Sequence, residues 1–272
     1  MYHNKNAENE LFKKLKNKDW VGAAVNMFVL PKITERIQKL FSISPGLNST
    51  NSSLYSAAYK KNKNLYFPVK DTTENIFHFV SNNDHVDLNL KELFRNQLIE
   101  FKNCALSTVC ESQVQTLTTA IDIIRQNSTE TFMELANLID TFVLLESEHF
   151  RSASHPHFIG ALFIKVQSCP SKLAISIVHE LAHQELFLLN FTDRLINEQF
   201  DYNEIHAPFQ NRSRPPIGRL HSAHALFRMI QFENKIEPEL AIKHQKLLEE
   251  TKLTFNQSEL TQFCQGIIHD VY

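Results

Sequence analysis

Hydrophobic residues recur every three or four positions over most of the first half of this chain, which is the spacing of amphipathic helices. Two short segments, Asp71–Glu74 and Thr108–Glu111, also have the spacing of a capping box, the signal at which a helix begins. A loop rich in Pro, Gly, Ser and Asn at 42–53 interrupts the series. We therefore expect residues 1–140 to form a helical N-terminal lobe, with 72–139 as a helical block. Two or three helices are predicted within 5–42. One helix each is predicted over 88–101, 107–125 and 130–139.

The pattern changes at Thr141, where short runs of β-branched and aromatic residues replace the helical spacing. Such runs predict strands, here at 141–147 and 158–167, with a polar stretch between them. An extra strand at 65–69 is compatible with the same pattern. After Pro170 comes a helical run, apolar on nearly every side, which is typical of a helix buried inside a protein. A polar stretch at 200–216 follows, and further helices are predicted over 217–235, 238–252 and 257–271.

The buried helical run contains the sequence His179-Glu180-Leu181-Ala182-His183, an HExxH motif. Residues four apart on an α-helix lie one above the other on the same face, so both imidazoles can reach one metal ion. Two ionisable histidines and a glutamate are costly to bury without partners, and a metal ion supplies that partner. We therefore predict an α+β, mostly helical fold with a small sheet beside a buried, zincin-like HExxH helix. Residues 141–272 would be the metal-binding catalytic region.

A third metal ligand is needed, and the residues alone leave several choices open. The stretch after His183 lacks the Gly and His spacing of metzincins, which excludes that subclass. A downstream glutamate would make a gluzincin-like peptidase, whereas a downstream histidine would make a three-histidine site. The glutamate candidates are Glu198 and Glu204, and the histidine candidates are His206, His221 and His224.

The composition of the chain excludes several classes of function. The 272 residues carry 28 Lys and Arg against 30 Asp and Glu, so the net charge of −2 gives no electrostatic attraction to nucleic acid. Gly is scarce, and no glycine-rich nucleotide loop is found. A polar N-terminus and the lack of a long apolar run predict a cytoplasmic protein without a membrane anchor. The four cysteines, Cys104, Cys110, Cys169 and Cys264, form no CxxC pair and are expected to be reduced, buried and inert.

The second half of the chain resembles a known family over about residues 150–235. These are the HExxH-motif proteins associated with ribosomal peptide natural-product clusters, described as iron- and 2-oxoglutarate-dependent peptide β-hydroxylases. The resemblance departs from the family pattern at Phe209, where Trp is usual, and at Gln210 and Asn211, where charged residues are usual. The matching residues are Gly160, His179, Glu180, His183, Pro208, Phe209, Arg214, Pro215, Gly218, Leu220, His221 and Phe227.

This resemblance implies that Fe(II) is held by His179, His183 and His221, leaving coordination positions for 2-oxoglutarate and O₂. It further implies that Arg214 binds the distal carboxylate of 2-oxoglutarate, since a guanidinium suits a carboxylate bidentately. Arg219 is the alternative clamp. Glu180 would hold or orient a group beside the metal.

Two other functions stay open on the sequence. In a zinc-dependent metallopeptidase or amide hydrolase, Glu180 would be the general base that deprotonates the metal-bound water. A peptide-binding partner protein without catalysis would use the helical first half for docking. All three functions predict a peptide or protein as the partner, and the cofactors would be Fe(II) with 2-oxoglutarate or, for the hydrolase, zinc.

Overall fold

The computed structural model describes residues 77–81, 104–108, 110–139, 141–148, 151–155, 160–192 and 194–268. The chain divides into two compact units, with one boundary between residues 184 and 185. We call residues 77–184 unit 2 and residues 185–268 unit 1, and we describe each by itself. The predicted features at 5–42, 42–53, 65–69, 71–74 and 88–101 lie outside the described residues, so the helical N-terminal lobe stays a prediction.

Unit 2 contains a small mixed sheet whose central strand is β3. The β3 sequence TFVLLES is buried at six of its seven positions, as expected for a strand covered on both faces. β3 pairs in parallel with β1 and β5, and its second half pairs antiparallel with β2, while β4 pairs antiparallel with β5. The strands are β1 (His78–Val80), β2 (Cys104–Leu106), β3 (Thr141–Ser147), β4 (Ser152–Ala153) and β5 (Ala161–Ile164).

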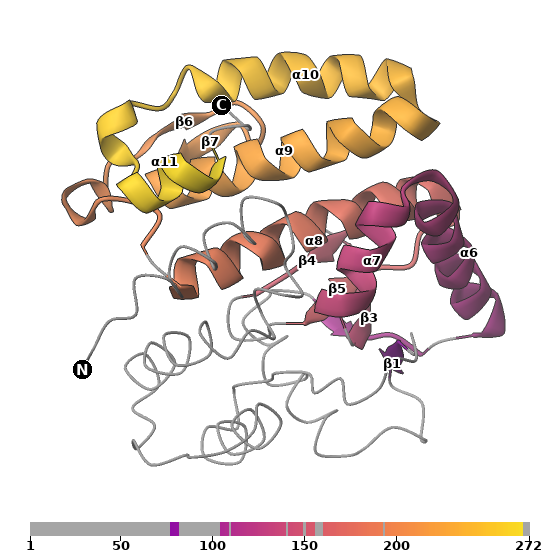
Figure 1. Cartoon of the computed structure of the whole chain (residues 1–272). Helices are drawn as coiled ribbons and strands as arrows, with labels where there is room; N and C mark the ends of the chain where they lie inside the picture. Colours follow the sequence, from indigo (N-terminus) through magenta and orange to yellow (C-terminus); the bar gives the residue numbers. More distant parts are fainter. Residues whose placement is uncertain are drawn as a thin grey trace, which may run out of the picture. The chain divides into compact units, whose positions relative to one another are not determined.

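Three helices belong wholly or partly to unit 2: α6 (Glu111–Asn127), α7 (Thr129–Leu138) and α8 (Pro170–Thr192) (Figure 1). α6 and α7 bury one apolar face each, which includes Leu117, Ile124 and Leu135. α8 begins with Pro at its first position, where the missing N–H costs nothing, and the unit boundary falls within it.

Unit 1 is built around a helical hairpin of α9 (Pro216–Ile236) and α10 (Pro238–Lys252), which run side by side in Figure 1. Their shared core consists of Ala223, Leu226, Ile230, Ala241 and Leu248. A two-stranded hairpin of β6 (Ile205–Ala207) and β7 (Arg212–Arg214) precedes α9. The remaining elements are the 3₁₀ helices η1 (Glu198–Phe200) and η2 (Gln257–Glu259) and the short helix α11 (Gln262–Ile268).

The predicted mostly helical α+β class with a small sheet is confirmed, and β3, α7, α8, α9 and α10 agree with their predicted ranges within a residue or two. The helical block over 72–139 is wrong at β1 and β2, because these segments pair with β3. α6 begins at Glu111, four residues later than the predicted start at 107, since Ser107 N donates to Leu144 O at 2.8 Å and prolongs the β2 pairing. Its N-cap is Cys110, with Gln113 completing the capping box.

Three smaller corrections follow from the same structure. Of the range 158–167, predicted as one strand, the described residues 160–167 form a strand only at Ala161–Ile164. The polar stretch 200–216 contains the β6–β7 hairpin. The helix predicted over 257–271 is divided into η2 and α11, because the hydroxyl of Thr261 between them bonds Arg194 O at 2.6 Å. Among the described residues, no helix is long and apolar enough to cross a bilayer.

The cysteines also differ from expectation. Cys264 is buried, and burial raises the pKa of its thiol to about 12. Cys110 is exposed, and hydrogen bonding, first from the Ser112 side chain, lowers the pKa of its thiol. Cys110, Cys169 and Cys264 are free thiols. The prediction of burial holds for Cys264, is wrong for the exposed Cys110, and does not hold for Cys169, which is half-buried.

Candidate metal centre

The HExxH residues lie near the middle of α8, a helix whose neighbouring positions are almost all buried. Leu181 and Ala182, between Glu180 and His183, are fully buried. Glu180 is buried to 2% exposure, whereas His179 and His183 are half-buried. The helix therefore holds the two imidazoles at the margin of the apolar core, where both side chains are partly exposed.

The two imidazoles converge. Their Nε2 atoms lie 3.0 Å apart, and the rings meet edge to face at a centroid distance of 4.6 Å. The distance is that of a hydrogen bond between the two rings. It is also close to the separation of two nitrogens that bind one ion at about 2.0–2.1 Å, which is about 2.9 Å at a right angle and about 3.3 Å in a tetrahedral site. The pair of donors predicted from the motif spacing is thus brought together within unit 2.

Glu180 adds an anionic group beside the histidines. Its Oε1 lies 3.9 Å from His179 Nε2, and its Oε2 accepts a hydrogen bond of 2.7 Å from the hydroxyl of Ser154. Ser154 directly follows β4, the last strand in the order β1-β3-β5-β4. The sheet edge therefore fixes one carboxylate oxygen and leaves the other facing His179.

Gln184 ties α8 to the sheet one residue after His183. Its side-chain oxygen accepts from Gly160 N at 2.9 Å, and its side-chain nitrogen donates to Ala161 O at 3.2 Å. Gly160 has a φ of 83°, a backbone conformation that favours glycine. The sequence offered a signal for Gln184, since a fully buried amide on an apolar helix must have hydrogen-bonding partners.

In unit 1, His221 lies on α9 and is half-buried, and its ring is 4.9 Å from that of Phe187. One turn further, His224 is buried, and its Nε2 lies 2.7 Å from Oε2 of Glu185. The other carboxylate oxygen of Glu185 is 3.3 Å from the guanidinium of Arg228, which is also buried. His224 is therefore part of an ion-pair cluster that the sequence reasoning missed.

The two candidate arginines have different surroundings within unit 1. Arg219 is fully buried, and its guanidinium bonds both carboxylate oxygens of Glu259 at 2.9 and 3.2 Å and also bonds Thr254 O. Its charged group also stacks 4.9 Å from the ring of Phe255. Arg219 thus has the bidentate carboxylate partner inside the protein that a substrate carboxylate would otherwise supply.

Arg214 ends β7 and is half-buried. Its Nε is buried and has no hydrogen-bonding partner within the described part of the chain. Burial lowers the pKa of this guanidinium, as does the nearby charge of Arg212, while Glu204 raises it. A Cβ at Gly218 would lie 3.4 Å from Arg214 Cβ and 3.5 Å from its Cδ, so the side chain of Arg214 runs closely over Gly218.

The other residues considered for the site are dispersed. Glu198, Glu204 and His206 are exposed. His179, Glu180 and His183 belong to unit 2, while His221, Arg214 and Arg219 belong to unit 1. Over the described ranges, no group of three or more His, Cys, Asp and Glu side chains is gathered as a ligand set. Comparisons with models of protein families and with curated proteins find no match for this chain.

Proposed function

We propose that this protein is an Fe(II)- and 2-oxoglutarate-dependent hydroxylase that acts on the β-carbon of a peptide or protein side chain. The observation that supports a metal site is the convergence of the His179 and His183 imidazoles at 3.0 Å beside the buried Glu180. The resemblance to the peptide β-hydroxylases supports the choice of iron and 2-oxoglutarate over other metals and co-substrates.

In this proposal His179, His183 and His221 hold the iron through imidazole nitrogen. The assignment of His221 rests on the resemblance. His224 is less suited than His221, because Glu185 and Arg228 already enclose it in an ion-pair cluster. Iron(II) with bound 2-oxoglutarate would supply the activation of O₂ that hydroxylation of an unactivated C–H bond requires.

Arg214 binds the distal carboxylate of 2-oxoglutarate in this proposal. One observation favours it over Arg219: the Arg219 guanidinium is already paired with Glu259. The Nε atom is buried and lacks a hydrogen-bonding partner among the described residues in both arginines. A partly desolvated guanidinium makes a stronger bidentate pair with a carboxylate than an exposed one does. Gly218 contributes by leaving room for the aliphatic stem of Arg214.

Glu180 is the residue on which a second candidate, a zinc-dependent amide hydrolase, would depend. Its Oε1 lies 3.9 Å from His179 Nε2. At this distance it could reach a water molecule bound to a metal ion that the two histidines hold. In a hydrolase this carboxylate would accept a proton from that water. In the hydroxylase it orients groups beside the metal, and Ser154 keeps it in place.

The test is an anaerobic titration of the metal-free protein with Fe(II), with and without 2-oxoglutarate. We expect a weak visible charge-transfer band that needs both additions, because a 2-oxo acid chelated to Fe(II) absorbs in this region. His221→Ala should abolish the band, whereas His206→Ala, which removes an exposed histidine of the same unit, should leave it intact. Arg214→Gln should raise the 2-oxoglutarate concentration needed for half of the signal at least about tenfold, the loss of one charge-assisted pair.

Tight zinc binding without any band would reject the hydroxylase and favour the hydrolase. Glu180→Gln then separates the two further, because a hydrolase without its general base loses most of its activity while keeping the metal. Loss of the band in His206→Ala together with its survival in His221→Ala would show that the third ligand is assigned wrongly.

A further inference from the structure

Two adjoining cavities lie in unit 2 away from the HExxH residues. The first has a volume of about 740 Å³ and is lined on its polar side by Ser107, Gln113, Glu146 and Glu148. The second, of about 620 Å³, is lined by Glu148, Arg151, Lys165, Lys172 and the segment between β5 and α8. Both are lined by Glu148, Lys165 and Val166, so they adjoin, and each has the size that small-molecule ligands occupy. We call the two together the cleft.

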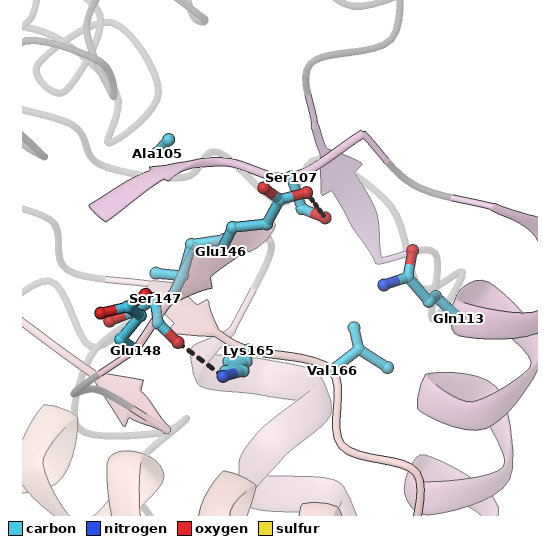
Figure 2. Close-up of a pocket in the computed structure, with 9 residues that line it drawn as sticks. Ala105, Ser107, Gln113, Glu146, Ser147, Glu148, Lys165 and Val166 are labelled. Atoms are coloured by element: carbon cyan, nitrogen blue, oxygen red, sulfur yellow. Dashed lines mark hydrogen bonds between the residues drawn. The ribbon is translucent and has the colours of Figure 1, made fainter. Parts of the chain in front are cut away.

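The cleft lies where β3 and β5 end. These strands are parallel, and Glu146 to Glu148 and Lys165 to Val166 are at or just beyond their carboxyl ends. Figure 2 shows Glu146, Gln113 and Lys165 around the same space, with the Lys165 ammonium bonded to Ser147 O at 2.5 Å. In open sheets with parallel strands, ligands bind outside the carboxyl ends of those strands.

One end of the cleft carries an excess of positive charge. Arg151 directly precedes β4 and Lys165 directly follows β5, and the hydrogen bond from Lys165 N to Arg151 O at 2.9 Å places them opposite each other at the ends of these paired strands. Like charges opposite each other on paired strands are unfavourable, and Lys172 adds a third cation to the same cavity. Arg151 and Lys172 form no ion pair with a described residue, and Glu148 is the one carboxylate in the described lining of this cavity.

The other end offers hydrogen-bonding groups instead. Glu146 is exposed, and its Oε1 accepts a bond of 3.4 Å from the buried hydroxyl of Ser107, which leaves Oε2 available. The Gln113 oxygen accepts from Cys110 N at 3.0 Å, so its amide nitrogen is the part available to a ligand. A carboxylate and an amide suit hydroxyl groups, as the acidic residues that bind ribose hydroxyls do in dinucleotide-binding α/β proteins.

We propose that this cleft binds a phosphorylated polyol of the sugar-phosphate class. The phosphate lies between Arg151, Lys165 and Lys172, where its charge of about −2 offsets their mutual repulsion. The hydroxyl-bearing part extends toward Glu146, Ser107 and Gln113. The proposal rests on unit 2 alone and does not depend on the metal site or on the proposed hydroxylase.

The test is calorimetric titration of the full-length protein with ribose 5-phosphate, inorganic phosphate, ribose and succinate. We expect ribose 5-phosphate to bind at least about tenfold more tightly than inorganic phosphate, and ribose and succinate to bind more weakly still, because each lacks one half of the recognised group. Binding of succinate as tight as that of inorganic phosphate would overturn the assignment to phosphate.

Variants assign the two ends of the cleft. Arg151→Gln and Lys172→Gln should each weaken ribose 5-phosphate and inorganic phosphate about tenfold, whereas Glu146→Gln should weaken only ribose 5-phosphate. Lys243→Gln, which removes an exposed lysine from α10, is the matched control and should change neither. All three cleft positions are exposed, so these variants should fold. The absence of ribose 5-phosphate binding in the wild type, or binding that Arg151→Gln and Lys172→Gln leave unchanged, would overturn the proposal.

Discussion

Histidine and glutamate serve different purposes in the two units of this protein. In unit 1, Glu185 pairs with His224 and Arg228, and Glu259 pairs with Arg219, so each buried charge meets an opposite charge. In unit 2, two half-buried imidazoles instead face each other with their Nε2 atoms 3.0 Å apart. A buried ion pair uses its donors and acceptors internally, whereas converging nitrogen atoms are suited to a shared third partner. Residue type alone therefore does not identify a binding site.

The largest expected effect is on the ion pairs. Glu185→Ala should lower the free energy of unfolding by about 3–5 kcal/mol, because it leaves the buried Arg228 guanidinium without this carboxylate. Urea unfolding followed by circular dichroism measures this. Glu249→Ala on α10 is the control and should cost less than about 0.5 kcal/mol, since its pair with Lys252 is exposed. Equal losses of unfolding free energy in the two variants would show that the buried ion pair stabilises the protein no more than the exposed one.

The Arg219–Glu259 ion pair of unit 1 makes the stability of the protein depend on pH, which gives a second test of the buried ion pairs. Burial by itself raises the pKa of Glu259, but hydrogen bonds from Arg219 and Asn203 outweigh it and hold this pKa below the usual value of 4.5. A carboxyl whose pKa is lower in the folded than in the unfolded state stabilises the protein above about pH 4.5, and this stability is lost as the pH falls through the folded-state pKa.

We therefore expect Glu259→Gln to destabilise the protein by about 2–3 kcal/mol at pH 7. The difference between the wild type and Glu259→Gln should shrink as the pH falls below 4.5. Urea unfolding of both proteins at about five pH values between pH 3 and pH 7 measures this difference in the free energy of unfolding. A difference that does not change with pH would contradict the account of Glu259.

The smallest effect is expected for the partner of the motif glutamate. Ser154→Ala removes the hydroxyl that donates to Glu180 Oε2 at 2.7 Å and should cost about 1–2 kcal/mol, the penalty for a buried acceptor that loses a neutral donor. Thr118→Ala, which removes a hydroxyl bond on the exposed side of α6, is the control and should be nearly neutral. A loss as large as that of Glu185→Ala would place Glu180 among the structural charges of the protein.

Elements defined by local pattern could be predicted from the sequence, and those defined by a distant partner could not. β3 and α10 have the predicted bounds, because an apolar run between polar ends and a proline at a first turn are local signals. β1 and β2 are three residues each, and their pairing with β3 joins positions tens of residues apart. β4 has only two residues and gave no pattern at all.

The same division applies to the candidate site. The convergence of His179 and His183 follows from four-residue spacing on a helix, and the structure agrees. The commitment of Arg219 to Glu259 spans forty residues, so the sequence could not distinguish it from Arg214 as a carboxylate clamp. Ser154 lies 26 residues before Glu180, so its hydrogen bond to this carboxylate could not be read from the local pattern of the sequence.

The double hydrogen bond of Gln184 has a consequence for any redesign of this helix. By bonding both Gly160 N and Ala161 O, the amide side chain occupies the start of β5 in the manner of a neighbouring strand. It therefore fixes which face of α8 is turned toward the sheet. One residue inserted between His183 and Gln184 would turn both histidines by about 100° relative to Ser154 and the sheet edge.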